Sequence, residues 1–268
     1  MMSISHPAPR TWIEPLARMG YAARGVIYLI IGLFAFLSAI GSGEEKDSKD
    51  ALQTLLSQPF GTILVWLLIA GLGGYVIWRL VQAVLDSDDH GNGAKALAIR
   101  AGLLVSALTY GTLAVYALSL MGVLSGGGSG GGKGKVADYL AGFVGSATVS
   151  LGLAVIMLGV AGAHVWKAYK RKYADHIDCN SAPMNLVHPV SIAGLTARGM
   201  VFLVIAVMFG YRFFNAADSS ADPSLKSALQ FVQDLPFGGF LLSMLGLGLI
   251  AFSAYSFAEA RWRRIDPT

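Results

Sequence analysis

The sequence predicts an all-α membrane protein with six transmembrane helices, arranged as three tandem hairpins. Hydrophobic residues make up 54% of the 268 positions and charged residues only 13%, whereas about a quarter of an ordinary soluble domain is charged. The hydrophobic residues gather in six runs, each near the length of about 20 residues that spans a hydrocarbon core. The third observation is an internal repeat, which divides the six runs into hairpins.

Helices are the expected state of all six runs. Inside a bilayer each segment must satisfy its own backbone hydrogen bonds, as a helix does. Transmembrane β-strands would be about ten residues long and would alternate in polarity, and these runs do neither. The predicted spans are residues 22–42, 61–85, 99–124, 143–168, 190–214 and 238–260.

The internal repeat is clearest near the two ends of the chain. Residues 20–28 read GYAARGVIY, and residues 194–202 read GLTARGMVF. An Ala-Leu-Gln segment that leads to Pro-Phe-Gly follows each copy, at 51–61 and again at 228–238. We therefore predict hairpin repeat 1 at residues 16–86 and hairpin repeat 3 at residues 190–264.

A third and degenerate hairpin, repeat 2, is predicted at residues 94–172. Its Arg100 aligns with Arg18, whereas Ser106 stands where repeat 1 has Arg24. Because each hairpin has two spans, successive hairpins enter the membrane from the same side, and the repeats are parallel. Three parallel hairpins predict a pseudo-threefold bundle.

The distribution of basic residues predicts which side each loop faces. With six spans, both termini lie on one side, together with residues 79–100 and 164–198. This side carries fourteen of the 20 Lys and Arg residues, so the positive-inside rule predicts that both termini, including an N-terminal tail at residues 1–15, are cytoplasmic. Topology thus explains the formal net charge of +4, and we expect no nucleic-acid partner. A cleavable signal peptide ending near Ala39 is the weaker alternative, because its removal would leave an odd number of spans.

Each Ala-Leu-Gln segment is predicted to form a short interfacial helix on the non-cytoplasmic side. Leu52, Leu55 and Leu56 are spaced like the apolar face of such a helix. The Pro-Phe-Gly corner would then turn the chain into the membrane, with proline in the first helical turn. Glycines inside the spans are expected to let neighbouring helices approach closely.

Ionisable residues inside the spans, the usual markers of transport or catalysis, lie near the ends of the spans, most of them at the predicted cytoplasmic end. The centres of the spans contain no Asp, Glu, Lys, Arg or His, which disfavours a proton-coupled carrier. The five histidines and the single cysteine, Cys179, match no catalytic or zinc-binding pattern. We therefore expect no enzyme activity, no metal and no cofactor.

A group of polar residues near the predicted cytoplasmic ends is the candidate site. The simpler interpretation of Arg24 and Arg198 is that they snorkel to lipid headgroups, while the glycine after each lets a neighbouring helix approach. The alternative is that both arginines face the bundle, pair with Gln82, Glu259 or backbone carbonyls, and bind an anionic headgroup or gate an axial path. The candidate cytoplasmic polar layer comprises Arg24, Arg198, Arg79, Gln82, Glu259 and His164.

The order of these motifs resembles a bacterial membrane family, the domain of unknown function twelve-oh-six (DUF1206). The resemblance is carried by Ala23-Arg24-Gly25, Ala51-Leu52, Pro59-Phe60-Gly61, Gly71-Leu72 and the YVIWR of residues 75–79. It extends over residues 16–264 and is weak in repeat 2, and in repeat 3 Phe252 and Tyr255 replace Tyr75 and Trp78. The resemblance implies tandem two-helix units in a bacterial inner membrane, and it implies no activity.

Two functions from different classes remain open. The first is a structural or accessory protein that packs in the lipid bilayer with a larger membrane complex or with its own copies. Glycine-rich spans and short loops favour it. The second is a passive channel or facilitator along the pseudo-threefold axis, which the repeat favours. The lining of such a path would be weakly polar, formed by Ser106, Thr109, Ser146, Thr148, Ser150, Ser243 and Ser253.

Overall fold

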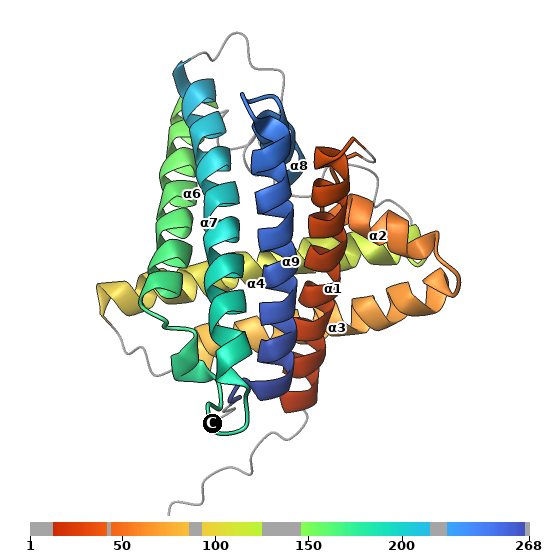
Figure 1. Cartoon of the computed structure of the whole chain (residues 1–268). Coiled ribbons are helices and arrows are strands. Elements are labelled where there is room, and N and C mark those ends of the chain that lie inside the picture. Colours follow the sequence, from red (N-terminus) through yellow and green to blue (C-terminus); the bar gives the residue numbers. More distant parts are fainter. Residues whose placement is uncertain (1–12, 42–43, 86–92, 125–145, 215–223, 266–268) are drawn as a thin grey trace, which may run out of the picture.

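The structure, a computed structural model, is described at residues 13–41, 44–85, 93–124, 146–214 and 224–265. Its six long helices are α1 (Ile13–Ala39), α3 (Gly61–Leu85), α4 (Ala94–Leu120), α6 (Ser146–Tyr169), α7 (Met184–Phe214) and α9 (Gly238–Trp262). Three short helices complete the described elements (Figure 1): α2 (Ser48–Leu56), η1 (Ala174–His176) and α8 (Leu225–Gln233). The described ranges contain no β-strand, which confirms the all-α class.

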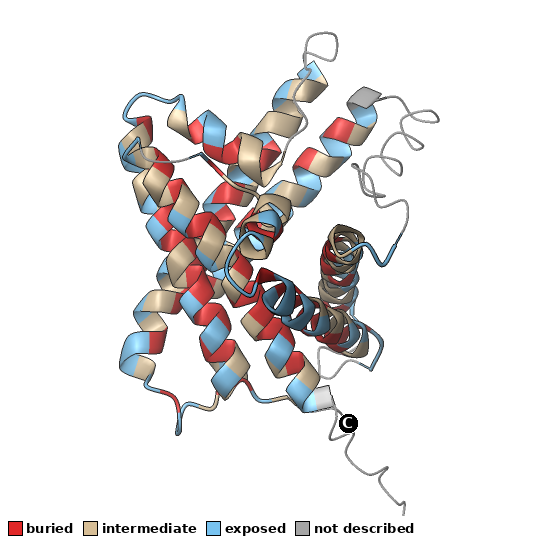
Figure 2. Ribbon diagram, turned by 90° about the vertical axis from the view of Figure 1, so that its right-hand side faces the viewer, coloured by how far each residue is buried: buried red, intermediate tan, exposed pale blue. Residues whose placement is uncertain are grey.

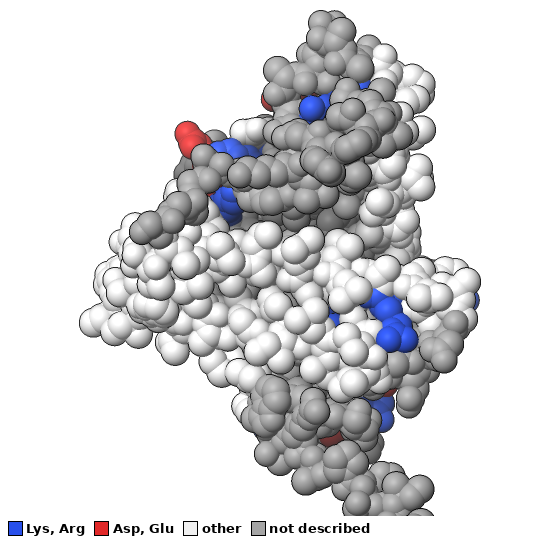
Figure 3. All heavy atoms as spheres, turned by 180° about the vertical axis from the view of Figure 1, so that it is seen from behind, with Lys and Arg blue, Asp and Glu red and all other residues white. Residues whose placement is uncertain are grey.

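Each of the six long helices is long and apolar enough to cross a membrane. The protein is therefore a multi-pass helical membrane protein, as predicted. The back of the molecule shows a broad uncharged surface with Lys and Arg at only a few places (Figure 3). Most of the N-terminal tail predicted at residues 1–15 lies outside the described residues, and its last three residues already belong to α1.

The long helices pack in a definite order. α1 packs against both α9 and α3, α3 packs against α4, and α9 packs against α7, which packs against α6. These contacts form one series of neighbours, from α6 through α7, α9, α1 and α3 to α4. Within the described residues, α4 and α6 have few contacts with each other. In Figure 1, α1, α6, α7 and α9 stand upright and α3 and α4 run across them, so the pseudo-threefold arrangement stays a prediction.

Equivalent glycines set the helix crossings in the two clear repeats. In repeat 1, a Cβ added to Gly20 of α1 would overlap Tyr75 of α3. In repeat 3, a Cβ added to Gly194 of α7 would lie 2.5 Å from the Cα atom of Phe252 in α9. Only glycine permits such an approach of two backbones. Figure 2 shows that buried residues concentrate on the faces where the helices meet.

The two Pro-Phe-Gly corners, called elbows from here on, have the same backbone conformation. Phe60 and Phe237 both have a left-handed φ of 62°, and the two residues are 78% and 86% exposed. The glycine that follows each has no room for a Cβ beside the carbonyl groups at the end of the short helix. The N-cap of α9 is Phe237, so Pro236 precedes this helix. The prediction that proline lies in the first helical turn is therefore wrong for this corner, where a left-handed phenylalanine lies between the proline and the helix.

The connection from α6 to α7 folds back over the end of α9. Ile177 forms an isolated β-bridge with Arg263, and the backbone N–H of Asp178 donates to the carbonyl of Trp262 at 2.9 Å. Tyr173 and Ile177 are almost fully buried. This connection therefore covers the end of the bundle at which the charged residues gather.

Candidate functional site

Arg24 lies inside the protein and makes three polar contacts across helices. Its Nε donates to the Ser256 hydroxyl at 3.0 Å and its Nη1 to the Tyr75 hydroxyl at 3.0 Å. Its Nη2 donates to the carboxylate of Glu259. Only 3% of Arg24 is exposed. The simpler interpretation, in which Arg24 snorkels to headgroups, is therefore wrong, because α9 supplies a carboxylate within reach.

Glu259 binds a second guanidinium, that of Arg263 at the end of the same helix. Arg263 Nη1 donates to the other carboxylate oxygen of Glu259 at 2.9 Å, and both side chains are at most 4% exposed. One carboxylate thus bridges two arginines in the interior and connects α1 to the end of α9. Such a buried charge group is stable only while its partners are present.

Arg79 joins the same group of side chains from α3. Its Nη2 donates to the Tyr75 hydroxyl, and its Nη1 donates to Gln82 at 2.9 Å. The Tyr75 hydroxyl therefore lies between Arg24 and Arg79. A second hydrogen bond between α3 and α1 runs from Trp78 Nε1 to the Tyr21 hydroxyl at 3.0 Å. We call the connected set the Arg24 network: Arg24, Tyr75, Arg79, Gln82, Ser256, Glu259 and Arg263.

Arg198, the repeat counterpart of Arg24, has different neighbours. Its guanidinium carbon lies 5.1 Å from the Tyr28 ring centre, 5.4 Å from that of Phe202 and 4.7 Å from that of Phe252. Its Nε is buried without a hydrogen-bond partner. Arg24 lies 5.1 Å from the same Phe252 ring, so the two repeat arginines share one aromatic side chain.

His164, the last predicted member, lies beside Arg198 and outside the Arg24 network. Its Nδ1 is 2.8 Å from the carbonyl oxygen of Val160 in the preceding turn. The centre of its ring lies 5.3 Å from the centre of the Phe202 ring. The structure thus brings Arg24, Arg79, Gln82 and Glu259 into one network and leaves Arg198 and His164 at its edge.

Sequence reasoning missed three members of the network: Tyr75, Ser256 and Arg263. A signal for Arg263 was present, because an acidic and a basic residue four positions apart lie on one helix face. Instead, the cluster of arginines at the end of the last span was interpreted only as a topology signal. Tyr75 and Ser256 have no local signal, since uncharged hydroxyls are common in membrane spans.

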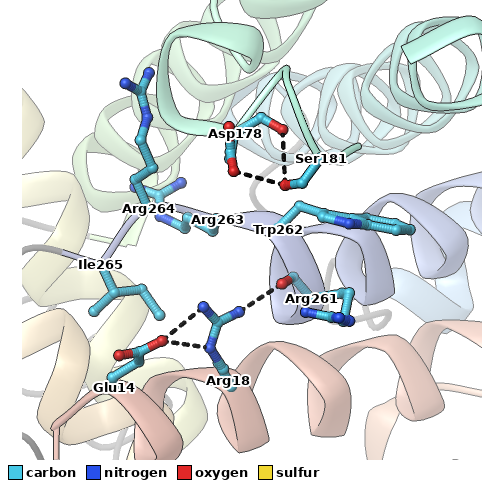
Figure 4. A pocket seen from close by; sticks show the side chains of 9 residues that line it. All are labelled: Glu14, Arg18, Asp178, Ser181, Arg261, Trp262, Arg263, Arg264 and Ile265. Atoms are coloured by element: carbon cyan, nitrogen blue, oxygen red, sulfur yellow. Dashed lines mark hydrogen bonds and ion pairs between the residues drawn. The ribbon is translucent and has the colours of Figure 1, made fainter. Parts of the chain in front are cut away.

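A cavity of about 400 Å³ opens at the same end of the bundle (Figure 4), where Arg18 is the central side chain. Arg18 donates to Glu14 at 2.7 and 2.9 Å and to the carbonyl of Arg261 at 2.7 Å. The hydroxyl of Ser181 donates to Asp178 at 2.6 Å, and hydrogen bonding from Ser181 lowers the pKa of the Asp178 carboxyl below its ordinary value. Arg18 and Glu14, and likewise Ser181 and Asp178, therefore satisfy each other within this cavity.

A family model described as Domain of Unknown Function (DUF1206) matches residues 19–86 and 193–263. The chain belongs to the DUF1206 family. A relative from Bacillus subtilis (strain 168), described as uncharacterized protein YxxB, is 31% identical over 270 residues. The match covers 96% of this chain and 93% of the relative. No solved structure matches.

The two DUF1206 segments each contain one repeat arginine and one elbow. The first segment includes Arg24, and the second includes Arg198 and Glu259. The ion pair between Arg24 and Glu259 therefore joins the two DUF1206 segments to each other. His164 lies between the segments, in the part of the chain predicted as repeat 2.

Proposed function

We propose that this DUF1206 protein is a non-enzymatic structural or accessory protein of the bacterial inner membrane. In this role it packs through the outer face of α6 against a larger membrane complex or a second copy of itself. The charged groups of the Arg24 network contact one another, and this supports a role in holding helices together.

The observation that carries the proposal is the contrast between two kinds of glycine. At the helix crossings, Gly20 and Gly194 meet the backbone of a neighbouring helix. On α6, a Cβ added to Gly152, Gly159 or Gly162 would meet nothing within 4 Å. The glycines of α6 thus have no neighbour within the described residues.

The open glycines lie on one exposed face of α6. Gly152 and Gly159 are two turns apart, and Ala163, also exposed, lies one turn further along the helix. Lipid tails are as apolar as leucine, so helices in a membrane associate through close packing of small residues and not through hydrophobicity. A stripe of small residues with no internal neighbour therefore favours a partner helix.

Replacing Gly159 with leucine tests this role. The side chain fits the isolated chain, because the space beside Gly159 is open, but it should block close approach of a second helix. Native electrophoresis of gently solubilised membranes should show a larger species for the wild type and mainly the single chain for Gly159→Leu. The matched control is Gly73→Leu in α3, where nothing lies within 4 Å either, and it should leave the larger species unchanged. An unaltered assembly in Gly159→Leu would contradict the proposal.

The channel alternative has less support from the predicted lining residues. The Ser253 hydroxyl donates to the Gly25 carbonyl between α9 and α1 at 2.6 Å. The hydroxyls of Ser243 and Thr109 donate to carbonyls of their own helices at 2.8 and 2.9 Å. Side chains engaged in this way do not need a water-filled path.

Reconstituted vesicles provide the corresponding measurement. We expect the leakage of ions and small neutral solutes to equal that of protein-free vesicles at every protein-to-lipid ratio. Leakage that rises in proportion to the amount of protein would instead favour the channel.

A further inference from the structure

We propose that Arg198 binds the phosphate group of an anionic phospholipid of the surrounding membrane. The inference concerns a ligand site and does not depend on the helix packing proposed above.

Arg198 is partly exposed and forms no ion pair with a carboxylate of the described residues. The described neighbours of its guanidinium are the rings of Tyr28, Phe202 and Phe252, and its buried Nε has no hydrogen-bond partner. Aromatic rings attract a cation only weakly compared with a charged partner. Because an unpaired charge is costly in a membrane interior, such a residue normally meets an acceptor there.

Arg24, the counterpart of Arg198 in repeat 1, shows which acceptors the protein itself can provide for an arginine at this position of the repeat. Arg24 meets the Tyr75 hydroxyl on its own hairpin and the Glu259 carboxylate on the neighbouring helix. Phe252 stands at the position equivalent to Tyr75 and lacks the hydroxyl. Arg198 has thus kept the charge and lost this acceptor.

The helices around Arg198 supply no free carboxylate. On α1 and α9, Glu14 and Glu259 are the only acidic residues, and both already bind other arginines. Gly199 faces α6, just as Gly25 faces α9, so α6 is the helix that lies where α9 lies for Arg24. The sequences of α4, α6 and α7 contain no Asp or Glu. The anion that balances Arg198 must therefore come from outside these three helices.

The surrounding charges also favour an anionic ligand. Lys167 Nζ lies 5.7 Å from the Tyr255 ring centre, and that ring packs on Phe252 at 5.8 Å. The cations gathered around these rings and in the Arg24 network are Arg24, Arg79, Lys167, Arg198 and Arg263. Among the described residues, Glu259 is the only carboxylate bonded to this group. A phosphate would offset part of the remaining positive charge.

The apolar surface of α4 and α6 fits acyl chains. α4 and α6 are the least buried of the six long helices. They expose large apolar side chains, among them Leu104, Val105 and Leu108 on α4 and Val155, Ile156 and Leu158 on α6. Three aromatic rings around the guanidinium provide no polar shell for a hydrated ion. An amphiphile with an anionic head and apolar tails meets both conditions.

Lipid binding to the purified full-length protein tests the proposal. Native mass spectrometry in a mild detergent should detect one phosphatidylglycerol retained per chain. Phosphatidylcholine with the same acyl chains should be retained at least about tenfold less. Arg198→Gln should lower the retention of phosphatidylglycerol by at least about tenfold, because charge-assisted hydrogen bonds to phosphate are lost. The control Lys170→Gln removes a charge from an exposed residue near the same end, and it should change nothing.

A second variant keeps the charge and covers the case in which Arg198→Gln does not fold. Phe252→Tyr places beside Arg198 the acceptor that Arg24 has in Tyr75, and it should lower the retention of phosphatidylglycerol roughly three- to tenfold. Wild-type retention in both variants would overturn the proposal. Displacement of phosphatidylglycerol by excess inorganic phosphate would also overturn it, because the site would then bind a soluble anion.

Discussion

Replacing Glu259 with glutamine should destabilise the folded protein by about 3–5 kcal/mol, because it leaves two buried guanidinium groups without their carboxylate. Glu259 accepts from both Arg24 and Arg263, and its side chain is only 3% exposed. Glutamine preserves the shape and one acceptor oxygen, so the loss reflects charge rather than volume. Titration of the protein in mixed micelles with sodium dodecyl sulfate, followed by tryptophan fluorescence, measures the change in the free energy of unfolding.

An exposed pair provides the matched control for this change. Glu14 accepts from Arg18 at the same end of the bundle, with side chains 51% and 33% exposed. Glu14→Gln should cost less than about 1 kcal/mol, since water screens an exposed ion pair. Equal effects of Glu259→Gln and Glu14→Gln would show that the buried bridge is not what holds α1 to α9.

Replacing Gly194 with alanine should have the second largest effect, a loss of about 3 kcal/mol or more as the crossing of α7 and α9 is forced open. The added Cβ would lie 2.5 Å from both the Cα and the backbone N of Phe252. A backbone cannot move aside as the end of a side chain can. The thermal midpoint in detergent, measured by the monodisperse fraction on size exclusion, should fall sharply.

The same helix provides a control with the opposite expectation. Gly210 also lies in α7, but a Cβ there would meet nothing within 4 Å. Gly210→Ala should therefore be neutral or slightly stabilising, by up to about 1 kcal/mol, because alanine loses less backbone freedom in a helix. A large loss in Gly210→Ala, or none in Gly194→Ala, would contradict this account of the crossing.

The elements of the fold follow from local sequence. Hydropathy alone locates the six spans. The Pro-Phe-Gly motifs locate both elbows, because the left-handed Phe60 and Phe237 each lie within the motif itself. The start of α7 at Met184 was harder to predict. The span was predicted from residue 190, because residues 184–189 are less apolar, but the helix begins before the apolar segment.

The candidate site was accessible only in part. Arg24, Glu259, Arg79 and Gln82 could be chosen because charged or strongly polar residues are rare in spans. The hydroxyl of Tyr75, which lies between two arginines, carries no such mark. Its role depends on the crossing at Gly20, which places it beside α1.

The clearest limit concerns the two copies of the repeat motif itself. Composition, hydropathy and the repeat were sufficient to establish a membrane protein with six long apolar helices and an arginine in the first and the fifth of them. Nothing in the two motifs distinguishes Arg24 from Arg198. Packing distinguishes them, because α9 brings Glu259 against Arg24, whereas α6 brings no acidic residue against Arg198. Hydropathy and periodicity are properties of a local stretch, but the partner of a buried charge is set by whichever distant helix lies opposite.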